Sequence, residues 1–594
     1  MAAAAPWSRF RIDTVTDSRP TEVEPASASW RDPLVAILVI ATATVLVYSN
    51  SFDASFHFDD MGSIVENEGI RDLSHQWPPS GSRWLGVLSF ALNYRLGGLE
   101  VFGYHAVNVL VHVCNGLLVA WLAAITLRTP AMRRAEAGQL LRRLLPVTAG
   151  LLFALHPVAT QAVTYIVQRV TSLATLFYLL SLALHARGRL SLEAERPSRA
   201  RAACLYSLSV VAAAAAMKTK EISFTLPIVA VGYELLFFRS RKRLLLLAPL
   251  AATALLVPAG LATHGQSLAD VLGGASRFPA ETQEISRSVY LLTQSRVVVT
   301  YLRLLLLPFR QNLDYDFPLS HSLAEPDVLL ALAILVAIGA SAVLLLVRCS
   351  RANRAAGMLV FFGIAWFFVT LSVESSIVPI RDVIFEHRVY LPAAGAGIAL
   401  GTALLWIVER LRLPVSLPLQ AAAALLITAG PLGVATYARN LVWKDELTLW
   451  SDVVAKSPRK SGPHNNLALT HQAKGQLDDA IREFREAIRL EAGPKEVRSN
   501  VGLAELHDNL GLAYRAKGRL DDAIREHREA IRLDPSLAAA HVNIALSYEG
   551  KGELDDAMRE YLEAIRLDPG WAKARLYLGR FLTRLRASSE RSSR

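Results

Sequence analysis

The sequence predicts an all-α protein in two parts, a membrane domain of about eleven spans followed by a solenoid of helical repeats. Composition indicates the first part, because 52% of the 594 residues are hydrophobic and they gather in blocks of nearly bilayer length. A recurring string indicates the second, because Leu-Asp-Asp-Ala begins at Leu477, Leu520 and Leu554. We expect a cytoplasmic tail, a membrane domain and an extracytoplasmic repeat domain, at 1–32, 33–438 and 439–594.

The expected spans follow the apolar blocks, since about 20 helical residues cross a bilayer. The segment before the first block carries four arginines, and no small-residue cleavage site follows that block. The chain is therefore expected to begin with a tail and an uncleaved helix rather than a signal peptide. The candidate spans are 33–50, 104–126, 144–163, 170–186, 202–217, 222–238, 243–262, 326–347, 356–373, 388–409 and 415–437.

One more apolar stretch, 290–307, decides the orientation. If it crosses the membrane, the basic loops at 348–354 and 410–412 fall outside, against the positive-inside rule. If it is re-entrant or lies along the outer surface, every basic cluster falls inside. The second arrangement is expected, and it places the N-terminus in the cytoplasm and the repeats on the extracytoplasmic side.

The net charge of +11 comes from arginines in short clusters between apolar blocks. Such clusters orient membrane helices, so the charge does not indicate nucleic-acid binding. The three cysteines, Cys114, Cys204 and Cys349, lie within or beside apolar runs and show no metal-ligand or disulfide spacing. The composition therefore predicts a multi-pass protein that contacts membrane lipid and no nucleic acid.

The repeat strings match the tetratricopeptide pattern. The second interval between them is 34 residues, and the first is 43 because of an insertion at 491–501. Asn466, Asn509 and Asn543 share one position in three first helices. An asparagine ladder in the concave groove could hold an acceptor or partner peptide, since an amide both donates and accepts. The alternative is that asparagine is simply common at this position.

The most specific candidate for chemistry is the pair Asp59 and Asp60, directly after the first span. One interpretation is a helix cap for 61–67. The other is a general base that deprotonates an acceptor hydroxyl, with the second acid or a bound cation balancing charge. The adjacent His57 could tune the pair or serve only as a hydrogen-bond partner. With 290–307 on the outer surface, the other polar motifs within apolar sequence are expected on the same face as this pair.

Seven segments together resemble the GT-C glycosyltransferases, and most closely the transmembrane and tetratricopeptide-repeat O-mannosyltransferases. The resemblance implies a GT-C-like membrane domain and a polyprenyl- or dolichyl-phosphate sugar donor. It also implies Asp59 as base, Asp60 as supporting acid or cation ligand, and inversion at the sugar carbon. The segments are SFHFDDMGSIVENEGI at 55–70, WLGVLSFALNYRLGG at 84–98, FGYHAVNVLVHVCNGLL at 102–118, FALHPVATQAVTYIVQR at 153–169, AMKTKEISFTLP at 216–227, NLDYDFP at 312–318 and FEHRVYLP at 385–392.

A departing lipid phosphate needs positive charge. Arg169, Lys220 and Arg388 lie in matched segments at expected outer span ends, so we expect them to bind the donor phosphate. The alternative is interfacial snorkelling of long side chains. Supporting roles are expected for the neighbouring Glu221, Glu386 and His387. No cofactor is certain, and a divalent cation, with Asp60 as a ligand, stays open.

The Ala, Arg and Leu bias indicates a bacterial chain, which favours the inner membrane and an undecaprenyl-phosphate donor of mannose or another hexose. The acceptor is a protein or glycan hydroxyl, and the repeats present it or a protein partner. Two other classes are considered. A polysaccharide ligase or polymerase is disfavoured because the chain has no large late loop. A membrane-anchored scaffold would leave the polar motifs at span ends without a role.

Overall fold

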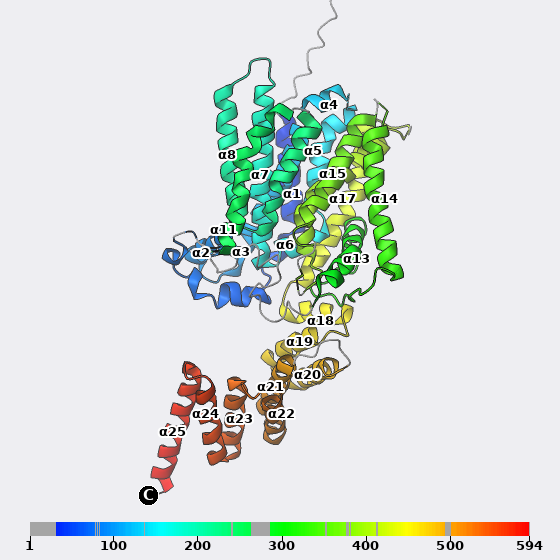
Figure 1. Cartoon of the computed structure of the whole chain (residues 1–594). Helices are drawn as coiled ribbons and strands as arrows, with labels where there is room; N and C mark the ends of the chain where they lie inside the picture. Colours follow the sequence, from blue (N-terminus) through cyan, green and yellow to red (C-terminus); the bar gives the residue numbers. More distant parts are fainter. Residues whose placement is uncertain are drawn as a thin grey trace, which may run out of the picture.

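Helices make up all the regular secondary structure that the computed structural model describes, which covers residues 31–592 apart from 78, 80, 82, 136, 239–240, 263–284, 351–352, 376–378, 381, 412–413 and 494–499. The tail expected at 1–32 lies almost entirely outside these residues. The membrane domain (Figure 1) contains α1 Arg31–Val47, α2 Trp84–Gly97, α3 Val101–Thr126, α4 Pro130–Arg134, α5 Gln139–Ala154, α6 Thr160–Val163, α7 Arg169–Leu192, α8 Arg199–Met217, α9 Leu226–Tyr233, α10 Ala248–Ala252, α11 Leu256–Ala262, α13 Arg287–Leu306, α14 Pro326–Arg348, α15 Arg354–Leu371, α16 Tyr390–Val408 and α17 Leu417–Val442.

Eleven helical segments in the described residues are long and apolar enough to cross a membrane. A further pair, Gln139–Ala154 and Pro157–Val163, passes the same test together but is bent by 52°. The bend lies at Pro157, which lacks the backbone N–H that a continuous helix would use. Ten of the eleven expected blocks correspond to ten of these segments, and the block expected at 144–163 corresponds to the bent pair. The eleventh segment is α13, which was not expected to cross.

The centre of the membrane domain is formed by α3, α5, α7 and α16, which pack on one another. Small residues allow close approach at its edge. A Cβ atom added at Gly363 of α15 would lie 2.4 Å from the backbone oxygen of Gly395 in α16. The helices that lead into the candidate site are therefore held by backbone-to-backbone packing.

Helix α13 runs beside the segment that joins α15 to α16. Tyr290 donates to the carbonyl of Glu374, Gln294 donates to that of Val383, and Tyr301 bonds Phe385. These contacts follow successive turns of α13 along one connecting segment, in the half of the membrane domain nearest the repeats (Figure 1). The length and composition of α13 suit a membrane span, so its expected position outside the membrane stays a prediction.

The repeat domain consists of antiparallel helix pairs. A glycine with positive φ ends the first helix of each of three pairs, at Gly475 (73°), Gly518 (77°) and Gly552 (83°), where a side chain would be strained. The insertion expected at 491–501 falls between α20 and α21, partly outside the described residues. The helices are α18 Glu446–Lys456, α19 Ser461–Ala473, α20 Leu477–Glu491, α21 Asn500–Ala516, α22 Leu520–Leu533, α23 Ala538–Lys551, α24 Leu554–Leu567 and α25 Ala572–Ser592.

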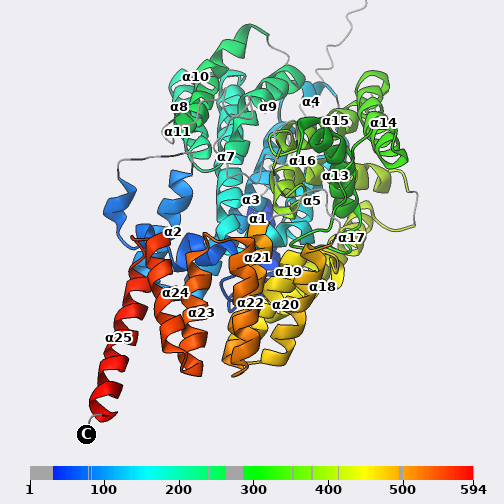
Figure 2. The ribbon, with the colours of Figure 1, turned by 60° about the horizontal axis from the view of Figure 1, so that its bottom comes forward.

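The loop after the first span packs directly on the start of the repeats. Ser55 N donates to the carbonyl of Lys444 at 3.2 Å, and the rings of Phe58 and Trp450 meet edge to face at 5.7 Å. Figure 2 shows the repeats extending below this end of the membrane domain. The expectation that the aspartate loop and the repeat domain share one side is therefore confirmed, whichever compartment that side faces.

Candidate active site at the repeat-facing end

Asp60 is fully buried, and both of its carboxylate oxygens accept backbone hydrogen bonds. Oδ2 accepts from His57 N at 3.0 Å, and Oδ1 accepts from Val167 N at 2.7 Å. Burial raises the pKa of Asp60 to about 7 against these bonds. The side chain does not cap the short π-helix Met61–Val65, so the helix-cap interpretation is wrong for Asp60. It ties the first loop to the segment before α7.

Asp59 presents the accessible carboxylate of the pair. Its backbone N donates to the Tyr165 hydroxyl at 3.0 Å, and the same hydroxyl interacts with the carboxylate. Desolvation raises the pKa of Asp59 despite that interaction, and the charge of Asp382 adds to the rise. The preceding Phe58 has φ of 44°, a strained value for a residue with a side chain. A carboxylate with a raised pKa on a constrained turn suits a general base.

His57 lies behind the pair and contacts the repeat domain. Its Nε2 lies 2.6 Å from the carbonyl oxygen of Trp443, so this nitrogen carries the proton and donates. Burial lowers the pKa of His57 to about 4, so the ring is neutral at pH 7. Its role in this arrangement is to position the loop.

Lys220 is 5% exposed and faces the same end of the membrane domain. Its Nζ lies 2.8 Å from the Glu374 carboxylate and donates to the Thr171 hydroxyl at 3.0 Å. The neighbouring Glu221 pairs instead with Arg83, at 3.3 Å. Two cations thus pair with two acids at this end of the membrane domain.

Arg388 forms no direct ion pair with a carboxylate of the described residues. Its guanidinium donates to the carbonyls of Val383 (3.1 Å) and Asp382 (2.7 Å), and it lies over the Phe385 ring. Neutral acceptors hold the side chain without cancelling its charge. Of the three cations expected to bind phosphate, Arg388 fits that task best.

Arg169 has a different environment from the one expected. It is fully buried, and its guanidinium donates to the side chains of Asn108 and Asn93, both at 2.5 Å, and to the carbonyls of Ser89 and Tyr104. Its face lies 4.7 Å from the centre of the Phe90 ring. The placement does not support a phosphate contact, because every nitrogen of the group already donates to a protein acceptor. Arg169 instead joins α2, α3 and α7.

Glu386 and His387 flank Arg388 but face elsewhere. The carboxylate of Glu386 accepts from the backbone N of Asn312 at 2.7 Å and from the Tyr315 hydroxyl at 2.6 Å. His387 stacks on Phe385 at 5.2 Å, and its Nδ1 is buried without a hydrogen bond. Lys220, Arg388 and Arg83 are all close enough to act electrostatically on His387. The structure therefore brings Arg388 and Lys220 together and turns Glu386 towards the 311–316 loop.

Two asparagines of the expected ladder form hydrogen bonds to the preceding first helix of the repeats. Asn509 donates to Asn465 of the preceding first helix at 3.2 Å, and Asn543 donates to Asp508 at 2.9 Å. Asn466 is half-buried at the equivalent position. The donors of two members are thus used between repeats, and binding of a peptide there stays a prediction.

The candidate donor set for a divalent cation is small. Both oxygens of Asp60 already accept N–H groups, and the Asp59 carboxylate interacts with the Tyr165 hydroxyl. Across the described ranges, no group of three or more His, Cys, Asp or Glu side chains is placed to hold a metal ion. Asp59 and Asp60 alone therefore do not make up a cation site in the described part of the chain, and a divalent cation at Asp60 stays a prediction.

Four residues of the site were not identified from the sequence: Tyr165, Arg83, Glu374 and Asp382. They contact or act on the identified residues across more than a hundred positions of chain, except for Asp382, which is six positions before Arg388. Two signals were available: Tyr165 lies within the matched segment 153–169, and Glu374 and Asp382 are acids in one loop between two apolar blocks.

Comparisons with known proteins agree with this architecture. Tetratricopeptide-repeat family models match residues 465–511 and 538–570, and a model described as TPR repeat matches 511–552. Protein O-mannosyl-transferase Tmtc3 of Drosophila melanogaster is 25% identical over 546 residues, covering 82% of this chain and 58% of its own. Protein O-mannosyl-transferase TMTC4 of Homo sapiens is 34% identical over 169 residues, covering 25% of this chain and 22% of its own.

Among solved structures, ArnT from Cupriavidus metallidurans bound to undecaprenyl phosphate is 16% identical, with a TM-score of 0.36, and covers 84% of this chain and 80% of that one. MamA is 24% identical, with a TM-score of 0.20, and covers 23% of this chain and 74% of that one. The chain spans less than two thirds of the length of the two curated relatives named above. Its sequence is similar to protein O-mannosyl-transferases, and its C-terminal part contains tetratricopeptide repeats.

Proposed function

We propose that the chain is a membrane glycosyltransferase that moves one hexose, mannose or another, from a polyprenyl phosphate to a protein Ser or Thr hydroxyl. The observation that carries the proposal is the Asp59–Asp60 turn, which lies between the membrane helices and the repeats. Similarity to protein O-mannosyl-transferases over 82% of the chain supports the same reaction class. The repeats would present the acceptor beside the turn, because Phe58 already contacts Trp450.

Asp59 is the base in this proposal. Its carboxylate takes the proton of the acceptor hydroxyl as the hydroxyl oxygen attacks the anomeric carbon of the sugar. The bond from that carbon to the phosphate oxygen breaks, and its electron pair leaves with the polyprenyl phosphate. Attack opposite the leaving phosphate inverts the configuration. Arg388 and Lys220 supply the positive charge that stabilises the departing phosphate.

The arrangement of basic loops supports an orientation for the protein. The Asp59 loop and the repeats would face the periplasm, with the N-terminus in the cytoplasm and the protein in a bacterial inner membrane. The clusters at 128–143, 187–201 and 239–243 would then be cytoplasmic, in agreement with the positive-inside rule. The repeat domain has no cysteine of its own, so labelling of a cysteine introduced there with a membrane-impermeant thiol reagent in intact cells tests this placement.

Sugar transfer by purified protein tests the function. The assay uses radiolabelled polyprenyl-phosphate hexoses with a protein acceptor mixture, with and without a chelator to detect dependence on a divalent cation. Asp59→Asn is expected to lower the rate by at least about a hundredfold, the typical contribution of a general base. The matched control is Asp53→Asn, an exposed aspartate in the same loop, which is expected to keep the wild-type rate.

Two results would contradict the proposal. Equal rates for wild type and Asp59→Asn would remove Asp59 as base. Absence of wild-type transfer from every donor, in protein that remains folded, would favour the scaffold class. Formation of a lengthening glycan would instead indicate the ligase or polymerase class.

A further inference from the structure

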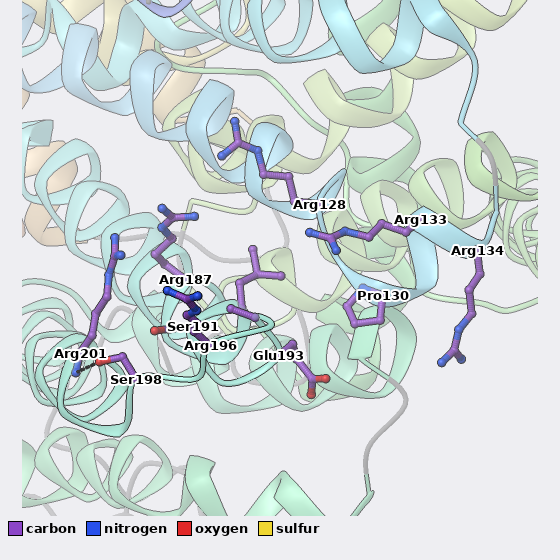
Figure 3. A pocket seen from close by; sticks show the side chains of 12 residues that line it. Arg128, Pro130, Arg133, Arg134, Arg187, Ser191, Glu193, Arg196, Ser198 and Arg201 are labelled. Atoms are coloured by element: carbon purple, nitrogen blue, oxygen red, sulfur yellow. Dashed lines mark hydrogen bonds between the residues drawn. The ribbon is translucent and has the colours of Figure 1, made fainter. Parts of the chain in front are cut away.

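An arginine-lined cavity lies at the end of the membrane domain opposite Asp59 and the repeats. It has a volume of about 540 Å³ and is formed by the ends of α3 and α7, by α4, and by the connection into α8. Figure 3 shows Arg133 and Arg187 extending towards the cavity from different segments, with Arg134 at its edge. Six arginines line it, together with a single acidic residue: Arg128, Arg133, Arg134, Arg187, Arg196 and Arg201, with Glu193.

The positive charge of this cavity is not balanced within the described residues. Glu193 is already paired with Arg189, at 3.3 Å, and with Arg243, at 3.0 Å, neither of which lines the cavity. None of the six lining arginines forms an ion pair with a carboxylate of the described residues. Arg187 is half-buried, and the guanidinium groups of Arg128 and Arg201 act on it as like charges.

The positive-inside rule accounts for arginines in these loops but not for their convergence. Orientation of helices requires only that basic residues lie near span ends, and it does not require residues of different connections to line the same cavity. Here, arginines from two separate regions, the connection from α3 to α5 and the connection from α7 to α8 with its adjoining helix ends, line one cavity. The helix dipoles at the ends of α3 and α7 contribute only about half a negative charge each. Like charges that line one cavity repel one another, and a bound anion would offset that repulsion.

We propose that this cavity binds a phosphate-bearing anion. Arginine suits this task because its planar guanidinium donates two parallel hydrogen bonds to phosphate oxygens. The cavity is large enough for a whole headgroup or a phosphate ester. Two sources share this chemistry: the headgroup of an anionic membrane lipid, which the apolar surfaces of α3, α7 and α8 bring within reach, and a soluble phosphate ester.

Thermal unfolding of the full chain tests the site and separates the sources. One arm titrates inorganic pyrophosphate and a nucleoside triphosphate against protein in neutral detergent. The other compares bilayers of phosphatidylcholine alone with bilayers that also contain phosphatidylglycerol. A ligand that binds only the folded state raises Tm in a saturable way. The rise is expected to weaken with added salt.

The test variant is Arg187→Gln combined with Arg201→Gln, and the matched control is Arg142→Gln combined with Arg143→Gln. The control residues lie near the start of α5. They are exposed and do not line the cavity. Loss of each charge-assisted contact is expected to weaken apparent affinity by roughly tenfold to a hundredfold. The control is expected to bind like wild type.

Stabilisation by phosphatidylglycerol without any response to pyrophosphate or nucleotide assigns the site to a lipid headgroup, and the reverse assigns it to a soluble phosphate ester. If neither raises the Tm of wild type, the proposal is rejected. It is also rejected if both double variants respond equally. Because wild type is titrated directly, a failure of the test variant to fold does not leave the question open.

Discussion

Burial without a counter-charge sets the behaviour of Asp60. Its two oxygens accept the N–H groups of His57 and Val167, yet desolvation prevails and its pKa rises to about 7. The neighbouring Asp59 stays accessible and also has a raised pKa. The turn therefore combines a buried acid that holds the backbone with an accessible acid that can exchange protons.

The raised pKa of Asp60 predicts a pH dependence of stability. Because its pKa is about 7 in the folded state and 3.8 otherwise, the folded state binds the proton more tightly. The free energy of unfolding should therefore fall as pH rises from about 4 to 7, by up to about 4 kcal/mol, and be constant above. Asp60→Asn has no carboxyl group at this position, so its free energy of unfolding should lack this pH dependence. The measurement is chemical unfolding of both proteins in detergent, and a difference that does not vary with pH would contradict the assignment.

The guanidinium group of Arg169 donates hydrogen bonds to four neutral acceptors. Arg169→Lys should lower the free energy of unfolding by about 2 to 4 kcal/mol, since a lysine cannot satisfy both Asn108 and Asn93. Arg95→Lys, at an exposed site on α2, is the control. Unfolding midpoints of the two variants provide the comparison, and equal stability would contradict the structural role.

At the scale of helices, a histidine–carboxylate bond recurs within the repeats. His464 Nδ1 lies 2.8 Å from Glu483, and the same bond joins the first and second helices of the next two repeats. The equivalent pairs are His507–Glu526 at 2.8 Å and His541–Glu560 at 2.7 Å. Each tie fixes one helix pair at the same register, beyond the small-residue packing that the repeat pattern predicts.

Removal of one tie should loosen one repeat. We expect His507→Ala to destabilise α21 and α22 by about 1 to 3 kcal/mol, the range for a charge-assisted hydrogen bond. Amide hydrogen exchange of these helices is the measurement. The control is His471→Ala, which removes a bond between residues five positions apart in one connection. Faster exchange of equal size in both variants would contradict a specific role for the tie.

The helices were more predictable than the contacts between them. The Leu-Asp-Asp-Ala strings and the apolar blocks gave their positions because local periodicity reports local structure. The Asp59–Asp60 turn was also recognisable. Its partners Tyr165 and Asp382 were not, because pairing over such distances depends on how the helices pack. For the same reason Arg169 has the motif of an outer-face cation but lies in the core.

At the scale of the whole molecule, the membrane and repeat domains are joined by a charged clamp. Lys460 pairs with Asp314 and lies 3.9 Å from Asp382, while Arg459 pairs with Asp316 at 3.1 Å. Since Asp382 also acts on Asp59, the clamp connects the position of the repeats to the candidate base. The repeats would thus position a bound acceptor relative to Asp59.

This connection predicts that the clamp matters more for protein acceptors than for small ones. Lys460→Glu places like charges against Asp314 and Asp382, and loss of about 1 kcal/mol of docking should lower transfer to a protein acceptor roughly fivefold. Transfer to a short Ser-containing peptide should change little, because such a peptide reaches Asp59 without the repeats. The control is Lys573→Glu, the same charge reversal at an exposed site at the far end of the repeats. Equal losses with both acceptors would mean that Lys460 acts on the active site itself, and no loss with either would show that the repeats do not position the acceptor.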